Sequence, residues 1–261
     1  MPADLKVVIL AGGFGSRISE DSSAKPKPML EIGGMPILWH IMKNLYGQGL
    51  DDFVILTGYR ASVIAEFFAN YRLHNSDVTF DSRGTGETMV VQSSRAEHWR
   101  VTLLDTGLTT MTGGRVKRAQ PVLGSAPFLL TYGDGLADVD IAALWRYHVG
   151  HGRAATLTAV QPQGRFGFLD LNGDRIESFR EKAQSDVGWI NGGFMILSSA
   201  IFPLIAGDAM PLEREPLERL ADAGELMAYR HTGFWQCMDT PRDHKLLEDL
   251  WQSGSSPWRN W

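Results

Sequence analysis

The chain has 261 residues, of which 44% are hydrophobic and 21% charged, an ordinary composition for a globular protein with room for a sizeable core. Its formal net charge of −5 argues against general affinity for nucleic acid or anionic membranes, so a polyanionic ligand needs local clusters of Lys and Arg. Cys237 is the lone cysteine, so no disulfide can form within the chain. No apolar run approaches the ~20 residues of a membrane-spanning helix, and no secretory leader is recognisable. We therefore expect a soluble cytoplasmic protein.

The N-terminal part of the chain alternates between strand and helix patterns. Residues 5–11 are a β-branched-rich apolar run ending in glycines, which predicts a buried strand, and residues 12–28 follow as a loop with basic residues and prolines. Pro36 opens a helical pattern that ends at Gly47 or Gly49. Residues 53–57 predict the next strand, and 62–71 the next helix. This alternation is typical of a doubly wound parallel sheet.

The remainder is less regular. Further strands are predicted at residues 78–80, 88–92, 100–104, 128–132, 154–160 and 189–197. Helices are predicted from the cap Asp140 to about His148, at 200–205 and 216–223, and after Pro241. We therefore predict an α/β fold with a Rossmann-like, mixed but mostly parallel sheet flanked by helices, in a single domain over residues 1–261 with C-terminal elaborations.

The glycine-rich segment that closes the first strand is the clearest chemical signal. Closely spaced glycines let backbone N–H groups converge on phosphate oxygens, because no Cβ blocks the approach. Arg17 can grip phosphate as a fork, and Lys27 supplies a compact charge between two prolines. This combination suits a nucleoside triphosphate. The candidate nucleotide-binding residues here are Leu10, Ala11, Gly12, Gly13, Gly15, Ser16, Arg17 and Lys27.

Three other interpretations of this segment compete with a triphosphate site. A dinucleotide fingerprint needs a small residue where this chain has Ile18, and the cations and prolines that follow do not open a helix. A P-loop needs Gly-Lys-Ser/Thr, which is missing here. A merely structural glycine turn is the remaining alternative.

Residues 10–17 together with 25–29 resemble the signature of the sugar-1-phosphate nucleotidyltransferases, which join a sugar 1-phosphate to a nucleoside triphosphate and release pyrophosphate. Longer segments narrow the resemblance to the branch that uses CTP and glucose 1-phosphate. They lie at 31–40, 68–71, 76–80, 105–107, 111–115, 131–135, 190–194 and 233–236. The resemblance implies a Rossmann-like fold, Mg²⁺ as cofactor, a homo-oligomer (a hexamer in this family) and a product that feeds nucleotide-sugar and surface-polysaccharide biosynthesis.

The resemblance also assigns roles to individual residues. Asp134 follows an apolar strand, where open α/β sheets bind ligands, and Asp134 and Asp239 match the family's metal-binding aspartates. The nucleotide is expected also to contact Thr110, Arg115, Gly133 and Asp134. The sugar side is expected to hold Tyr132, Glu181, Lys182, Asn191 and Gly192. Arg17, Lys27 and Lys182 are the candidate catalytic cations, although Ala183 replaces the proline that usually follows this lysine.

Several alternatives stay open at this point. Without a role in binding, Lys182 would be a surface lysine and either aspartate would be a turn residue. The segment Asn191-Gly192-Gly193 would then be a strand bulge. The same chemistry with another triphosphate or a modified hexose 1-phosphate competes with CTP and glucose 1-phosphate, and a non-catalytic nucleotide-sugar sensor is the distant alternative. The tryptophans of the C-terminal tail are candidates for packing between subunits: Trp251, Trp258 and Trp261.

Overall fold

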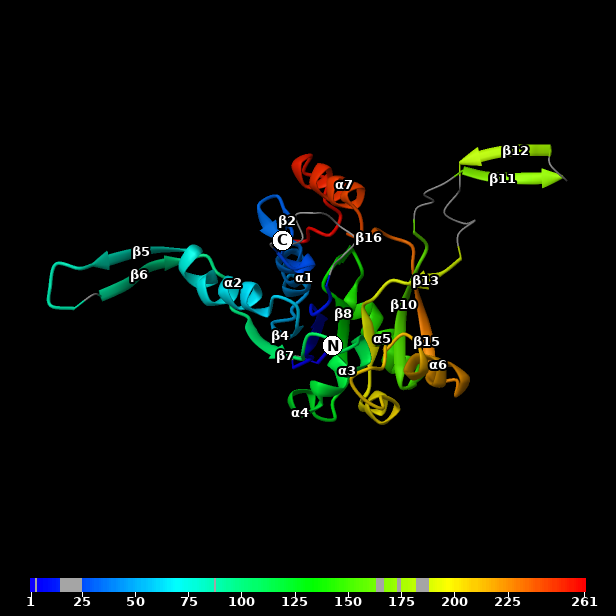
Figure 1. The fold of residues 1–261 in the computed structure, drawn as a ribbon, viewed down its shortest axis with the longest axis horizontal. Helices are drawn as coiled ribbons and strands as arrows, with labels where there is room; N and C mark the ends of the chain where they lie inside the picture. Colours follow the sequence, from blue (N-terminus) through cyan, green and yellow to red (C-terminus); the bar gives the residue numbers. More distant parts are fainter. Residues whose placement is uncertain (3, 15–24, 87, 163–166, 173–174, 182–187) are drawn as a thin grey trace.

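The computed structural model describes residues 1–2, 4–14, 25–86, 88–162, 167–172, 175–181 and 188–261. An eight-stranded sheet forms its centre, in the order β13-β10-β14-β8-β1-β4-β7, with β15 along the other edge of β10 (Figure 1). Strands β7, β4, β1 and β8 run parallel, and β14 reverses the direction against β8. The strands are β1 Val7–Leu10, β4 Asp52–Thr57, β7 Arg100–Asp105, β8 Phe128–Tyr132, β10 Ala155–Val160, β13 Ile190–Asn191, β14 Met195–Leu197 and β15 Leu226–His231.

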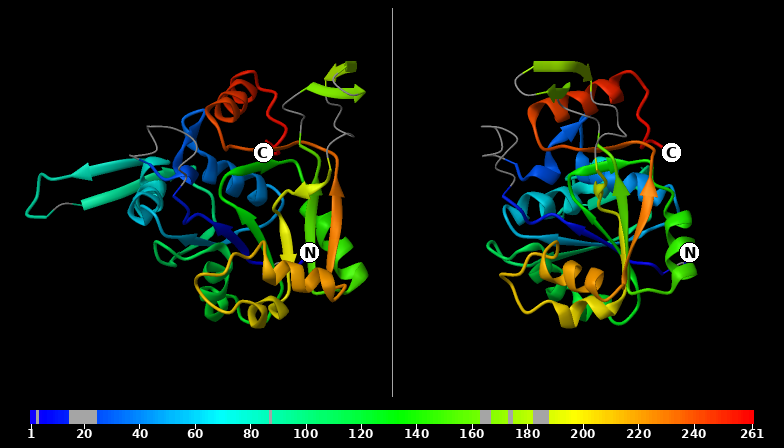
Figure 2. Two further views of the ribbon diagram at one scale, coloured as in Figure 1. Left: turned by 45° about the vertical axis from the view of Figure 1, so that its right-hand side comes forward. Right: turned by 90° about the vertical axis from the view of Figure 1, so that its right-hand side faces the viewer.

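Helices cover both faces of this sheet, which is buried between two apolar clusters (Figure 2). In β1, Val7 and Ile9 point to one cluster while Val8 and Leu10 point to the other. The first cluster packs under α1 Ile37–Tyr46, α2 Ala61–His74, α5 Ile141–His151 and α7 Pro241–Gln252. The second packs under α3 Thr112–Arg118, α4 Gln120–Leu123, α6 Glu215–Asp222 and the 3-10 helix η4 Ser199–Leu204. The predicted fold class is confirmed. Within the described residues, no helix is both long enough and apolar enough to cross a membrane.

Smaller two-stranded sheets surround the central one. They pair β2 Glu31–Ile32 with β3 Met35–Pro36, β5 Ser76–Asp81 with β6 Thr88–Ser94, β9 Gly135–Ala137 with β16 Trp235–Cys237, and β11 Gly167–Asn172 with β12 Arg175–Glu181. The β5–β6 hairpin projects far from the body of the molecule (Figure 1). The β9–β16 pair matters most for function, because a candidate aspartate adjoins each of its strands.

Three sequence predictions need correction. The strand expected at residues 189–197 is interrupted between β13 and β14, where Gly193 and Phe194 take positive φ angles of 76° and 47°. The loop expected at 12–28 includes the start of a 3-10 helix, η2 Lys27–Met29. The segment between β7 and β8, for which the sequence predicts no element, contains α3 and α4. The sequence did not predict these two helices because they contain the glycine pair at 113–114 and Pro121, and both residue types disfavour helix.

The C-terminal tail folds back onto its own chain. Trp258 is fully buried, and its backbone oxygen accepts a hydrogen bond from Asn44 Nδ2 at 2.5 Å. The ring of Trp261 meets that of Trp39 edge-on, with 5.7 Å between centroids. The expectation that these tryptophans pack between subunits is therefore wrong for Trp258, whose surface is taken up by α1 and the core of the same chain.

Candidate active site

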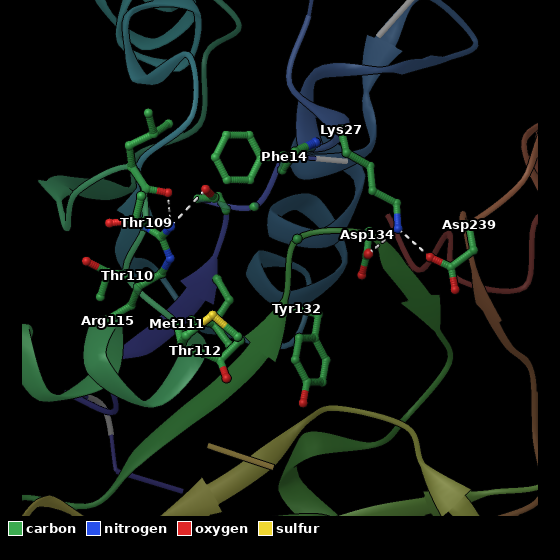
Figure 3. Close-up of a pocket in the computed structure, with 17 residues that line it drawn as sticks. Phe14, Lys27, Thr109, Thr110, Met111, Thr112, Arg115, Tyr132, Asp134 and Asp239 are labelled. Carbon is green, nitrogen blue, oxygen red and sulfur yellow. Dashed lines mark hydrogen bonds and ion pairs between the residues drawn. The ribbon is translucent and has the colours of Figure 1, made fainter. Parts of the chain in front are cut away.

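A cavity of about 420 Å³ opens at the carboxyl ends of β1 and β8 (Figure 3). This is the edge where parallel α/β sheets bind ligands. Most of the nucleotide-binding residues expected from the sequence meet here. The lining consists of Leu10, Ala11, Gly12, Gly13, Phe14, Lys27, Pro28, Leu108, Thr109, Thr110, Met111, Thr112, Arg115, Tyr132, Gly133, Asp134 and Asp239.

Arg115 shapes the wall beside the glycine segment. Arg115 is 4% exposed, and its guanidinium donates to the backbone oxygens of Thr57, Gly107 and Gly12, each at 2.9 Å. It also donates to Thr106 Oγ1 at 2.5 Å. A side chain on Gly12 has no room, because a Cβ there stands 2.1 Å from the guanidinium. One arginine thus ties the end of β1 to the loops after β4 and β7.

The charged end of the cavity is built on Lys27. Its ammonium donates to Asp239 Oδ1 at 2.5 Å and to Asp134 Oδ2, and its side chain is only 13% exposed (Figure 3). Burial by itself lowers the pKa of Lys27, but the attraction and hydrogen bonds of Asp134 and Asp239 outweigh it, so the pKa is raised. Lys27 therefore carries its charge throughout the physiological pH range.

The β9–β16 ladder brings the two aspartates together. Asp134 immediately precedes β9 and Asp239 follows β16, and the ladder pairs Gly135 with Cys237 at that end. The N–H of Met238 donates to the oxygen of Asp134 at 2.8 Å, which closes the junction. Two carboxylates separated by more than a hundred residues of sequence thus reach the same ammonium.

The first turn of α7 holds the second aspartate in place. Thr240 caps this helix, and its side chain and that of Asp243 form a reciprocal capping box. Asp243 Oδ2 also accepts the N–H of Asp239 at 3.1 Å. Asp243 is 6% exposed. The helix start therefore fixes the direction in which Asp239 faces the cavity.

Tyr132 forms the floor of the cavity at the end of β8. Its hydroxyl donates to Glu213 Oε1 at 2.8 Å and accepts from Asn191 Nδ2 at 3.1 Å. Asn191 also accepts the N–H of Gly193 at 2.9 Å, and the oxygen of Gly192 accepts from Trp235 Nε1 at 2.8 Å. Asn191 therefore adjoins the cavity through Tyr132, and neither Asn191 nor Gly192 is among the lining residues.

The predicted site residues are placed as follows. The cavity gathers eleven of them, namely Leu10, Ala11, Gly12, Gly13, Lys27, Thr110, Arg115, Tyr132, Gly133, Asp134 and Asp239. Gly15, Ser16, Arg17 and Lys182 lie outside the described residues, and Glu181 ends β12 with its backbone alone described. Sequence reasoning missed Phe14, Pro28, Met111 and Thr112 as lining residues, and Glu213 behind them. Met111 and Thr112 open α3, which the sequence did not predict.

The donor set decides what this site can bind. The carboxylate oxygens of Asp134 and Asp239 suit a hard divalent cation such as Mg²⁺. The described residues contain no group of three His, Cys, Asp or Glu able to hold a metal, so any cation here draws further ligands from substrate or water. Cys237 is an unsuitable ligand, because burial and then Asp239 raise the pKa of its thiol to about 12.

The chain is similar in sequence and in fold to known nucleotidyl transferases. Residues 6–236 match the nucleotidyl transferase family. A glucose-1-phosphate cytidylyltransferase of Salmonella typhimurium is 54% identical over 98% of this chain and 100% of its own length. A probable glucose-1-phosphate cytidylyltransferase of Bacillus subtilis is 42% identical over the same shares. The crystal structure of HddC from Yersinia pseudotuberculosis complexed with GMP-PN has the same fold, with a TM-score of 0.70 and 24% identity over 95% of this chain and 99% of that one.

Proposed function

The chain belongs to the nucleotidyl transferase family, and from this premise we propose that it transfers the cytidylyl group of CTP to α-D-glucose 1-phosphate, giving CDP-glucose and pyrophosphate. The activity named for the Salmonella typhimurium relative is carried over because eleven of the residues expected for such a transfer, Lys27, Asp134 and Asp239 among them, line one cavity. The observation that carries the proposal is Lys27, charged and fixed between Asp134 and Asp239 beside a glycine segment open to phosphate.

The reaction needs no general base from the protein. The attacking group is a phosphate oxygen of glucose 1-phosphate, which is already ionised at neutral pH, and the attacked atom is the α-phosphorus of CTP. The obstacle is repulsion between two anions and the alignment of attacking and leaving oxygens. We assign Lys27 to the α-phosphate, where its charge offsets the negative charge that develops in the transition state.

Other assignments rest on the family resemblance. Arg17 is proposed to hold the leaving pyrophosphate, with Gly15 and Ser16 beside it, and Lys182 to hold the sugar phosphate next to Glu181. On the sugar side, Tyr132 is supported by its place on the cavity floor, and Asn191 by its bond to Tyr132.

Cytosine is assigned to the wall opposite Lys27. The backbone of Ala11, Gly12 and Gly13 and the side chain of Thr110 line this part of the cavity. Thr110 is 7% exposed, so only a small part of this residue is open to the cavity. The guanidinium of Arg115 donates its hydrogen bonds to protein oxygens, so we propose that Arg115 stabilises the walls of the base pocket.

Mg²⁺ is the proposed cofactor, held by Asp134 and Asp239. These residues fit the ion, since both carboxylates converge on one ammonium and both are oxygen donors. A bound ion would supply positive charge to offset the negative charge of the phosphates. With both carboxylates engaged by the ion, Lys27 would be free to face the α-phosphate from the cavity wall that it lines.

The assembly and location are proposed on weaker grounds. The family resemblance supports a homo-oligomer, specifically a hexamer. The single free thiol, Cys237, suits a cytoplasmic protein that makes a nucleotide sugar for polysaccharide synthesis. Size-exclusion chromatography with light scattering measures the assembly directly.

The decisive experiment compares nucleoside triphosphates. The protein is incubated with Mg²⁺, glucose 1-phosphate and CTP, UTP, dTTP or GTP in turn, and released pyrophosphate is measured. We expect CTP to be strongly preferred and pyrophosphate release to depend on both glucose 1-phosphate and Mg²⁺. Preference for another triphosphate overturns the cytidylyl assignment. Binding of CTP without release of pyrophosphate favours a non-catalytic sensor.

A further inference from the structure

Glu213 lies behind the cavity, in the segment between η4 and α6. Both of its carboxylate oxygens accept hydrogen bonds from residues that line the cavity. Oε2 accepts from Thr112 Oγ1 at 2.5 Å, and Oε1 accepts from Tyr132 Oη at 2.8 Å. Thr112 starts α3 beside the proposed base pocket, whereas Tyr132 ends β8 on the proposed sugar side. One carboxylate therefore joins two walls of the cavity.

The backbone around Glu213 is fixed against α3. Gly114 allows this contact, because a Cβ there stands 2.5 Å from the Cα of Asp208. The N–H of Met111 donates to the oxygen of Asp208 at 2.8 Å, and that of Leu212 donates to Thr112 Oγ1, also at 2.8 Å. Leu212 is fully buried. Glu213 is thus presented from an anchored segment, and Thr112 keeps a bond to Leu212 that does not depend on Glu213.

The position of Tyr132 depends on Glu213 more than the position of Thr112 does, because Thr112 also bonds to Leu212. The hydroxyl of Tyr132 has one proton, and that proton is donated to Glu213, while Asn191 occupies an acceptor position of the same oxygen. The hydroxyls of Thr112 and Tyr132 point to the same side of the cavity (Figure 3). Burial, followed by the nearby Glu213, raises the pKa of Tyr132, so the hydroxyl stays protonated and able to donate.

We propose that Glu213 is a positioning residue of the active site: held by Thr112, it fixes the Tyr132 ring as the floor on which the sugar 1-phosphate lies. This inference rests on the proposed function. Both hydrogen bonds have a charged acceptor, which makes them stronger than bonds between neutral groups. Glu213 is itself exposed, but both of its carboxylate oxygens are bonded to residues of the cavity lining, whereas an exposed glutamate without such partners contributes little.

The test is a double-mutant cycle. Wild type, Glu213→Ala, Tyr132→Phe and the double variant are assayed for pyrophosphate release with glucose 1-phosphate and CTP varied separately. Tyr132→Phe keeps the ring and removes the donor to Glu213 together with the acceptor for Asn191. Each single change is expected to lower kcat/KM for glucose 1-phosphate about tenfold. The double variant is expected to lose about tenfold as well, because both changes remove the same bond. The KM for CTP is expected to stay within about twofold, since Thr112 keeps its bond to Leu212.

Two further variants control the experiment. Glu218→Ala changes an exposed glutamate on α6, outside the cavity lining, and is expected to match wild type. Glu213→Gln keeps one acceptor oxygen and the side-chain shape, so it is expected to fall between wild type and Glu213→Ala and covers the case in which the alanine variant folds poorly.

Three results overturn the role of Glu213: wild-type kinetics in Glu213→Ala, single losses that multiply in the double variant, or equal rises in KM for both substrates. The absence of pyrophosphate release by wild type is a different outcome. It overturns the proposed function on which the inference rests.

Discussion

At the scale of the residue, the site is dominated by one cation between two anions. Lys27 neutralises only part of the charge on Asp134 and Asp239, so the end of the cavity keeps a net negative charge in the free protein. A triphosphate is repelled from such a place unless a divalent cation accompanies it. The arrangement therefore favours binding of CTP together with Mg²⁺ over binding of CTP alone.

Lys27→Ala is expected to lower kcat by about 10²–10³, the usual loss when a charge aimed at a transition state is removed. The melting temperature is expected to change little, because Asp134 and Asp239 are partly open to water, at 29% and 37% exposure. Lys25→Ala is the matched control, since Lys25 is half exposed and pairs with Glu31 at 2.6 Å. A Lys27→Ala protein with near-normal turnover contradicts the assigned role.

At the scale of the element, the start of α7 serves both stability and the site. Asp243 accepts from the N–H and hydroxyl of Thr240 and from the N–H of Asp239. Removing its negative charge weakens the helix cap and frees the loop that carries Asp239. The two effects are separable by experiment, because the Thr240 hydroxyl accepts the N–H of Asp243 in the cap, whereas the N–H of Asp239 donates to Asp243.

Asp243→Asn is expected to raise the Mg²⁺ concentration needed for half-maximal activity by roughly tenfold, as is usual when a group that orients a metal ligand is changed. Activity is measured across a Mg²⁺ titration. Thr240→Ala is the control; it is expected to lower stability by about 1 kcal/mol with a smaller change in the Mg²⁺ requirement. An unaltered Mg²⁺ requirement in Asp243→Asn counts against this account.

A second element, α5, is sensitive to acid. His148 and His151 both lie 2.8 Å from Thr156 Oγ1. Burial, followed by repulsion from His151, lowers the pKa of His148 to about 4. An unfolded histidine titrates near 6.5, so below that pH the unfolded chain binds a proton that the folded chain refuses. Stability contributed by His148 is therefore present at neutral pH and is lost as the pH falls from about 6.5 toward 4.

The measurement is urea unfolding at pH 7 and pH 5.5. Wild type is expected to lose roughly 1 kcal/mol of unfolding free energy through His148 over this interval. The His148→Gln protein cannot take up a proton at this position, so its unfolding free energy is expected to fall by roughly 1 kcal/mol less than that of wild type over the same interval. The same loss in both proteins is the outcome that contradicts the assignment to His148.

Elements also show what the sequence predicted and what it did not. Strands β1, β4 and β8 were foreseen because burial on both faces makes each a continuous apolar run. Strand β15 was missed because its residues are half exposed and lack that run. The glycine segment was singled out from local sequence, and both aspartates through the family resemblance. Glu213 was not, since its role depends on the packing of its segment against α3.

At the scale of the whole molecule, the tail completes the core. Trp258 is among the largest fully buried side chains and sits against His40, to whose Nδ1 its indole N–H donates at 3.4 Å. Phe234 packs against the same ring, with 5.6 Å between centroids. Because this packing joins α1 to the tail, it holds together segments that are far apart in the chain.

Trp258→Ala is expected to lower the unfolding free energy by about 3–5 kcal/mol, the usual effect of removing a fully buried aromatic side chain. Trp189→Ala is the control, because Trp189 is 40% exposed and its stacking with Arg230 contributes about 1 kcal/mol at most. Chemical denaturation of both proteins gives the comparison. Equal losses would show that the tail is not part of the cooperative core.

The position of Trp258 has a consequence during synthesis. It is 218 residues beyond His40, the α1 residue that it covers. At a translation rate of about 5–20 residues per second, α1 waits roughly 10–40 s for this partner to leave the ribosome. During that interval the apolar side of α1 that Trp258 later covers is open to chaperones, so the nascent chain is expected to be a chaperone client until its last residues emerge.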